Sequence, residues 1–180
     1  MGCCIFAINY FTKIRSSRKT MENFTHIDSA GNPSMVDVGE KATTRRTAKA
    51  RSIVVLDPVI LEKLKNDDIH TKKGPVFQTA IIAGVMAAKR TGDLIPLCHP
   101  LGLENCQINI FLNEQQEVII ECTASLTGKT GIEMEALTGA SVAALTVYDM
   151  CKAFSHNIII KETRLIEKTG GKKDFKLQEN

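Results

Sequence analysis

The chain has 180 residues and a formal net charge of +3, with 43% hydrophobic and 24% charged residues. These proportions are ordinary for a soluble globular protein, and no apolar run approaches the roughly 20 residues of a membrane-spanning helix. The composition therefore excludes a membrane-spanning protein, and the length predicts one domain with a sizeable core.

The positive charge is concentrated at the N-terminus. Residues 1–20 hold four basic residues and no acid, so residues 21–180 carry 19 basic and 20 acidic side chains. The stretch begins MGCC, but Phe6 stands where a myristoylation motif needs Ser or Thr. An organelle transit peptide and a start at Met21 remain open alternatives. We expect residues 1–22 to be a disordered or dispensable extension, residues 23–176 a single domain, and residues 177–180 a flexible C-terminus.

The cysteines predict neither disulfides nor a metal centre. The six cysteines, at positions 3, 4, 98, 106, 122 and 151, form no C-x-x-C motif and no disulfide-framework spacing. They are typical of reduced thiols in a cytoplasmic protein. Cys98 and His99 are adjacent but lack the second pair of ligands that a zinc site needs, so we expect no metal site.

The first half of the body contains a basic segment, a strand and a helix in that order. Residues 41–51 include five basic residues and no acid. Such a segment is usually a solvated face and otherwise a binding site for nucleic acid or polyphosphate. Residues 52–56 predict a buried strand, and residues 58–66 predict a short helix that starts at Pro58.

A second helix is predicted over residues 72–90, beginning near Pro75. Its apolar stripe includes Gly84, whose small size allows close approach to a sheet. In the following loop, residues 93–101, two prolines bracket Leu97, Cys98 and His99 and restrict the backbone. A lone histidine is most often packed or at the surface, but one held in this way is a candidate site residue.

The remaining elements complete a recognisable order. Residues 105–113 and 117–126 predict two strands joined as a hairpin, and residues 157–168 predict a last strand. The order β-α-β-β-α-β indicates an α+β fold, a ferredoxin-like antiparallel sheet with helices on one face. RNA-recognition domains share this order but need aromatic platforms on the central strands, where this sequence offers only Phe111.

The longest predicted helix, residues 131–154, is apolar on two sides. One side runs through Thr138, Val142 and Leu145 to Asp149 and Lys152, which face each other three residues apart. This pair is either a structural ion pair at a helix end or a general acid/base pair with shifted pKa values.

Three segments, 73–101, 126–153 and 167–175, together with 35–46, closely resemble the cyclic pyranopterin monophosphate synthase family of molybdenum cofactor biosynthesis. The resemblance covers residues 24–175, and its most specific strings are IPLCHPL and KTGIEMEALT. It implies a ferredoxin-like catalytic domain assembled as a homohexamer, a trimer of dimers with sites at subunit interfaces.

The resemblance also implies the reaction. The substrate would be (8S)-3',8-cyclo-7,8-dihydroguanosine 5'-triphosphate, a cyclised GTP derivative, which a lyase converts to cyclic pyranopterin monophosphate with release of diphosphate. We expect a cytoplasmic enzyme that needs no cofactor, with magnesium able to arrive on the substrate phosphates. Nucleic acid and membrane are not expected as partners.

Site residues follow from the same resemblance, position by position. The implied catalytic residues are Asp149, Lys152, Lys73 and His99. The implied substrate-binding residues are Leu97, Cys98, His99, Met134, Glu135, Glu133, Lys41, Arg46 and Lys168.

The residues themselves are compatible with this chemistry. A triphosphate needs lysines and arginines, and ring opening and closure are proton transfers that a positioned acid or base assists. Glu135 and Asp149 would lie about 21 Å apart on one continuous helix. Either the helix starts after Glu135 and the preceding loop folds back, or two chains related by a twofold axis share the site. The apolar line that leads to Asp149 favours the shared site, which we predict. A non-catalytic nucleotide sensor and an RNA binder remain the alternatives.

Overall fold

The computed structural model describes residues 32–178. The segment 1–22, expected to be dispensable, lies outside the described residues. The segment that begins at Asp37 forms one compact unit, and all the helices and strands named below belong to it.

A five-stranded antiparallel sheet forms the base of this unit. Its strands are β1 (Thr44–Val55), β5 (Asn105–Leu112), β6 (Val118–Gly128), β7 (Ile159–Thr169) and β8 (Phe175–Lys176). Their order across the sheet is β5-β6-β1-β7-β8. With β8 set aside, this is the arrangement that the predicted β-α-β-β-α-β order requires, so the ferredoxin-like α+β fold is confirmed.

Strand β1 is longer than predicted because two-thirds of it, residues 44–51, lies in the basic segment. Ala48 and Ala50 are buried on the side of the helices, whereas Lys49 and Arg51 lie on the other side. Both cations pair there with the carboxylate of Glu121 on β6, at 2.6 and 2.9 Å. The alternation is that of a half-buried strand, with charged residues on its outer side.

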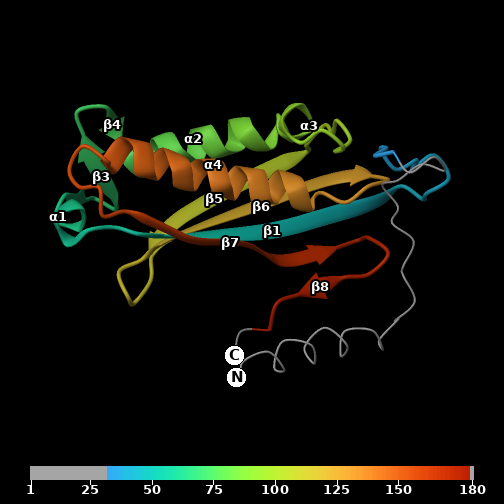
Figure 1. Ribbon diagram of the computed structural model, residues 1–180. Helices are drawn as coiled ribbons and strands as arrows, with labels where there is room; N and C mark the ends of the chain where they lie inside the picture. Colours follow the sequence, from blue (N-terminus) through green and yellow to red (C-terminus); the bar gives the residue numbers. More distant parts are fainter. Residues whose placement is uncertain (1–31, 179–180) are drawn as a thin grey trace, which may run out of the picture. The chain divides into compact units, whose positions relative to one another are not determined.

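Two long helices cover one face of the sheet (Figure 1), α2 (Val76–Ala88) and α4 (Glu133–Cys151). The short helix α3 (Thr91–Leu94) follows α2. Close contact between α2 and α4 depends on glycine: a methyl group added at Gly84 would lie 2.7 Å from the Gly139 carbonyl oxygen and would collide with the Ile108 side chain. Gly84 thus allows close approach to a second helix as well as to the sheet.

The predicted helix over 58–66 is shorter than expected. Helix α1 spans Pro58–Leu61, and a three-stranded sheet follows, built from β2 (Leu64–Lys65), β3 (Asp68–Thr71) and β4 (Gly74–Pro75). Asn66 and Asp67 both have positive φ angles, 53° and 60°, as a tight turn between β2 and β3 requires. The turn ends any helical continuation.

The core lies between the sheet and the two long helices. Ile120 on β6 and Ala140 and Val147 on α4 are fully buried there. None of the described helices is both long and apolar enough to cross a membrane.

Candidate functional site

Asp149 sits between two lysines near the C-terminal end of α4. Lys152, at the helix C-cap, places its Nζ 2.7 Å from Asp149 Oδ1. Lys73, from the turn between β3 and β4, places its Nζ 2.9 Å from Oδ2. The predicted pair three residues apart is therefore present, and a third charged group from a distant segment joins it.

This arrangement fixes the charge of Asp149. The hydrogen bond from Lys152, followed by that from Lys73 and the charges of both lysines, lowers the pKa of Asp149 to about 2. The same contact raises the pKa of Lys152 above its usual value. All three side chains are about half exposed, between 50 and 56%. In the single chain the group is therefore an ionised, solvent-accessible carboxylate with two ammonium donors.

The backbone around Lys73 is held by Thr71. The Thr71 hydroxyl oxygen accepts a hydrogen bond from the Lys73 N–H at 3.0 Å, and the hydroxyl donates to the Gly74 carbonyl oxygen at 3.2 Å. Gly74 has φ = 112°, a conformation that suits glycine. These contacts place Lys73 at the tip of a tight hairpin.

A second charged group lies near the N-terminal end of α4. Lys168 on β7 places its Nζ 2.7 Å from Glu133 Oε1. Burial by itself would raise the pKa of Glu133, but the Lys168 hydrogen bond and the charges of Lys168 and Arg46 hold it below its usual value. A cavity of about 180 Å³ adjoins this pair. Its lining includes four cations, Lys41, Arg46, Lys168 and Lys172.

The glycine turn after β7 shapes this cavity. Gly170 has φ = 79°, and a methyl group there would collide with the Arg45 carbonyl oxygen. The Gly170 carbonyl oxygen accepts a hydrogen bond from the Thr44 hydroxyl at 2.6 Å, and the Gly170 N–H donates one to the Asp174 carboxylate at 3.0 Å. Gly171 and Lys172 then line the cavity.

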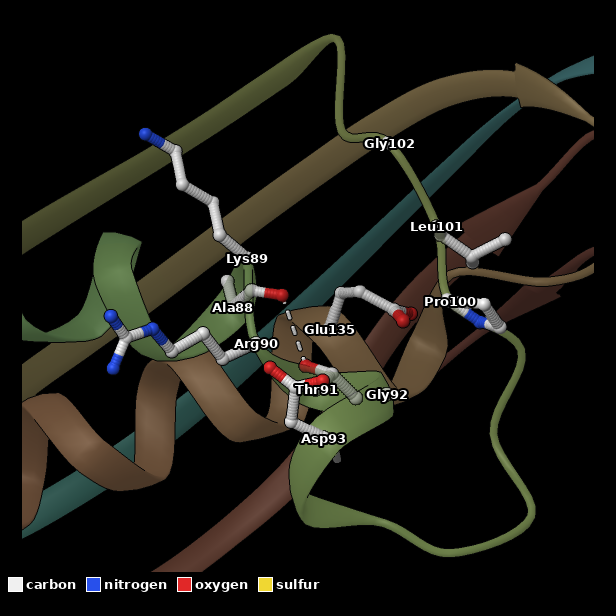
Figure 2. Close-up of a pocket in the computed structure, with 10 residues that line it drawn as sticks. All are labelled: Ala88, Lys89, Arg90, Thr91, Gly92, Asp93, Pro100, Leu101, Gly102 and Glu135. Atoms are coloured by element: carbon white, nitrogen blue, oxygen red, sulfur yellow. Dashed lines mark hydrogen bonds between the residues drawn. The ribbon is translucent and has the colours of Figure 1, made fainter.

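Glu135 borders a further cavity of about 250 Å³ (Figure 2). The residue is only 3% exposed, and burial, with a smaller contribution from the charge of Glu133, raises the pKa of Glu135. Figure 2 shows its carboxylate pointing toward Pro100, while the side chains of Lys89 and Arg90 extend away. A buried carboxylate with a raised pKa beside a cavity is typical of a functional site.

The loop that carries Leu97, Cys98 and His99 lies on the same side of the domain as Glu135. Burial, and then the negative charge of Glu135, raise the pKa of the Cys98 thiol. The chain continues from His99 into Pro100, which lines the Glu135 cavity. Met134, adjacent to Glu135 in the first turn of α4, is 37% exposed. The loop and the first turn of α4 therefore form one neighbourhood.

The expected site residues thus fall into two groups at opposite ends of α4. Asp149, Lys152 and Lys73 meet at its C-terminal end. The residues implied to bind substrate, together with His99, lie toward its N-terminal end. One continuous helix, Glu133–Cys151, separates the groups, so a single chain does not bring them together.

Three cations that line the cavities were not singled out from the sequence. Lys172 lines the cavity beside Glu133, and Lys89 and Arg90 line that beside Glu135. Lys89 and Arg90 end the predicted helix over 72–90, and Lys172 follows the Gly170–Gly171 pair. Basic residues at a helix end and after a glycine turn are the signals that point to them. Among the described residues, no group of three or more His, Cys, Asp or Glu side chains is placed to hold a metal ion.

A ferredoxin-like domain with an ionised aspartate between two lysines and with a cavity lined by cations has the features of an acid–base enzyme for an anionic substrate. Comparison with known proteins makes the assignment specific. The chain belongs to the MoaC family, which matches residues 35–171.

Curated relatives agree with this family. The chain is 51% identical over 163 residues to a protein of Xanthomonas oryzae pv. oryzae named cyclic pyranopterin monophosphate synthase, covering 91% of this chain and 96% of the relative. It is 52% identical over 155 residues to the molybdenum cofactor biosynthesis bifunctional protein of a Synechocystis species, covering 84% of this chain. It is 46% identical over 181 residues to molybdenum cofactor biosynthesis protein 1 of Dictyostelium discoideum, covering 91% of this chain.

The relatives differ in length. The chain spans 45% of the Synechocystis protein and 29% of the Dictyostelium protein, but nearly all of the Xanthomonas protein. The matched region is thus found both as most of a protein and as part of a larger one.

Proposed function

We propose that this chain is a cyclic pyranopterin monophosphate synthase, a lyase of molybdenum cofactor biosynthesis. Its substrate is (8S)-3',8-cyclo-7,8-dihydroguanosine 5'-triphosphate, and its products are cyclic pyranopterin monophosphate and diphosphate. The proposal rests on membership of the MoaC family and on the name of the Xanthomonas relative, which this chain matches over nearly its whole length.

The observation that carries the chemistry is the double ion pair at Asp149. Its carboxylate accepts hydrogen bonds from Lys73 and Lys152, which keep it ionised while holding two protonated amines beside it. Asp149 serves as a proton acceptor, and Lys73 and Lys152 as donors, while the rings open and close. Each positioned acid or base of this kind contributes ~10²–10⁴-fold to a proton-transfer step. His99 is the fourth catalytic residue of the proposal.

The cavity beside Glu133 is suited to the triphosphate. Its four cations, Lys41, Arg46, Lys168 and Lys172, provide the charge that phosphate oxygens require. Arg46 is oriented by a hydrogen bond of 2.9 Å from its Nε to the Gly128 carbonyl oxygen. Glu133 already pairs with Lys168, so phosphate binding at this cavity would redistribute that ion pair.

The base-derived rings are assigned to the neighbourhood of Glu135. The Cys98 thiol lies close enough to Glu135 to feel its charge, Leu97 and His99 flank Cys98 in the chain, and Met134 adjoins Glu135 in the first turn of α4. A largely buried carboxylate can accept hydrogen bonds from ring N–H groups when ionised and donate one when protonated. Burial raises the pKa of Glu135 and so favours its protonated form more than in an exposed glutamate.

The proposed oligomeric state is based on the separation of the two groups of site residues at opposite ends of α4. We propose a homohexamer, a trimer of dimers, in which the Asp149 group of one chain and the Glu135 group of another complete each site. The proposal includes no resident cofactor, with magnesium entering on the substrate phosphates, and it places the enzyme in the cytoplasm without nucleic acid or membrane as partner.

The deciding experiment is to incubate the purified protein with the cyclised GTP derivative and to measure diphosphate release together with the pterin product. Stoichiometric formation of both supports the proposal. Binding of the substrate without any turnover would instead make the protein a nucleotide sensor, and strong salt-dependent affinity for RNA would make it an RNA binder.

A further inference from the structure

Asp68 holds the base of the hairpin that carries Lys73. This carboxylate is only 7% exposed. Oδ1 accepts hydrogen bonds from the Ile69 N–H at 2.6 Å and from the Phe77 N–H at 2.8 Å, and Oδ2 accepts one from the Gln78 N–H at 3.2 Å. One buried side chain therefore connects β3 to the start of α2.

The contact replaces a helix cap that the sequence does not provide locally. The N-cap of α2 is Pro75, and it makes no side-chain capping hydrogen bond. Phe77 and Gln78 belong to the first turn, whose N–H groups have no acceptor within the helix. Asp68 supplies that acceptor from nine and ten residues upstream, and its negative charge suits the positive end of the helix.

The hairpin of β3 and β4, whose base Asp68 holds, has little stability of its own. Strands β3 and β4 share only two residue pairs, His70 with Pro75 and Thr71 with Gly74. Pro75 has no N–H to donate, which weakens this short ladder further. The position of the turn at Lys73 thus depends on what anchors its two ends.

Asp68 also lies close to the last turn of α4. Burial raises the pKa of the Cys151 thiol to about 11, and the charge of Asp68 acts in the same direction. Cys151 is fully buried and is two residues from Asp149 on the same helix. Asp68 therefore lies between the start of α2 and the end of α4, where the Lys73–Asp149 contact forms.

We infer that Asp68, together with Thr71 at the tip of the hairpin, is a positioning residue that holds Lys73 against Asp149. Asp68 fixes the hairpin at its base by capping α2, and Thr71 fixes the backbone of Lys73 at the tip. Neither residue touches the substrate. The inference rests on the proposed function for its kinetic consequence, but not for its structural one.

The structural consequence is tested without substrate. The amine of Lys73 is acylated with a limiting amount of an N-hydroxysuccinimide ester, and modification is quantified by peptide mass spectrometry relative to the exposed Lys176. The Lys73 amine donates a hydrogen bond to the Asp149 carboxylate, and an amine held in such a contact reacts more slowly with the ester, so Asp149→Asn should raise its relative rate several-fold. Asp68→Asn should raise it similarly, with no further increase in the double variant.

Asp57 offers a matched control. It is also a capping carboxylate, accepting a hydrogen bond from the Val59 N–H at 3.1 Å at the start of α1. Its other hydrogen bonds come from Ser155 and Asn157, so its partners lie outside the Lys73 hairpin. Asp57→Asn should leave the acylation of Lys73 unchanged. Circular dichroism and thermal unfolding establish that each variant is folded. If Asp68→Asn does not fold, Thr71→Val, which removes the hydroxyl beside Lys73, decides the question by the same measurement.

The kinetic consequence is a fall in kcat of ~10-fold or more for Asp68→Asn with little change in KM, because a displaced catalytic group lowers the rate more than it weakens binding. Unchanged Lys73 acylation and unchanged kcat in the folded variants would overturn the inference. Failure of the wild-type protein to release diphosphate would overturn the proposed function instead, and the acylation result would still decide the role of Asp68.

Discussion

The ammonium group of Lys73 lies 2.9 Å from the carboxylate of Asp149, although the two residues are 76 positions apart in the sequence. The contact joins a two-pair hairpin to the end of the longest helix. It gives Asp149 a second cation beside the local one from Lys152. An exposed helix-end ion pair usually contributes little to stability, so a second lysine from a distant segment favours a role in chemistry.

We predict that Asp149→Asn preserves folding and substrate binding but lowers kcat by ~10²-fold or more, because the amide cannot accept a proton in the reaction. Steady-state kinetics with the cyclised GTP derivative measures kcat, and thermal unfolding controls for stability. Since the side chains of this group are about half exposed, we expect a small but measurable loss of stability at pH 7. A rate close to that of the wild type would make the ion pairs structural.

The lowered pKa of Asp149 also predicts how the stability of the folded protein depends on pH. The folded-state pKa of Asp149 is about 2, below its ordinary value of 3.8, so the stabilisation by its ion pairs is present above the ordinary value and is lost as the pH falls toward 2. The difference in stability between the wild type and Asp149→Asn should therefore shrink over this window. Urea unfolding at a series of pH values measures it, and a difference that grows on acidification would contradict the lowered pKa.

The raised pKa of Glu135 predicts that ionisation of this residue lowers the stability of the folded state, the opposite of the effect expected for Asp149. The pKa of Glu135 is raised by burial and then by the charge of Glu133, so the folded state is penalised when Glu135 ionises. Glu135→Gln should therefore be more stable than the wild type at pH 8, and the gain should disappear as the pH falls below the ordinary pKa of glutamate, 4.5. Urea unfolding at both ends of this range measures the gain. A variant that is equally stable at pH 8 would show that burial of Glu135 carries no such penalty.

Much of the fold was predictable because its main elements are long and regularly patterned. The predicted helix over 72–90 corresponds to α2, and the predicted strands over 105–113 and 117–126 correspond to β5 and β6. The first two-thirds of β1, residues 44–51, was not predicted as a strand, because Lys49 and Arg51 on its outer side give this segment a basic composition. Nor was the small sheet predicted, because the sequence over 58–66 favours one helix from Pro58, whereas the helix ends at Leu61 and the chain turns back at Asn66 and Asp67.

The site was predictable only where contacts are local. Asp149 and Lys152 are three residues apart, and helical periodicity alone places them together. The contacts of Lys73 and of Lys168 span 76 and 35 residues and depend on how the hairpin and β7 fold back onto α4. Periodicity contains no information on such contacts. The resemblance to a family identified those residues, and the structure shows which carboxylate each one meets.

A further prediction concerns the contact between α2 and α4, which sets the relative position of the Lys73 hairpin and Asp149. Gly84→Ala would place a methyl group 2.7 Å from the Gly139 carbonyl oxygen and in collision with the Ile108 side chain. We expect the free energy of unfolding to fall by about 1–3 kcal/mol, the usual cost of overpacking. The control is Gly102→Ala, where an added methyl group meets nothing within 4 Å. Urea unfolding of both variants tests the difference, and equal stability would show that the two helices can separate without cost.

The last prediction concerns the two ends of α4. The helix is continuous from Glu133 to Cys151, so Glu135 and Asp149 are separated by fourteen residues, or about 21 Å. Two carboxylates that far apart cannot both touch one pterin-sized ring system. Between them, Leu145 is 57% exposed and Thr138 and Val142 are only partly buried, which leaves an apolar line that a second chain can cover. We therefore predict that each site takes Glu135 from one chain and Asp149 from another, related by a twofold axis.

Complementation between inactive variants tests this arrangement. Glu135→Ala and Asp149→Ala are prepared separately, shown to be inactive, then denatured, mixed and refolded together. In a mixed dimer with shared sites, one site carries both substitutions and the other carries neither, so part of the wild-type activity should return. If each site belonged to a single chain, every site would keep one substitution and the mixture would stay inactive. Mixed oligomers are verified by mass spectrometry of differently tagged chains, and their persistent inactivity would rule out the shared site.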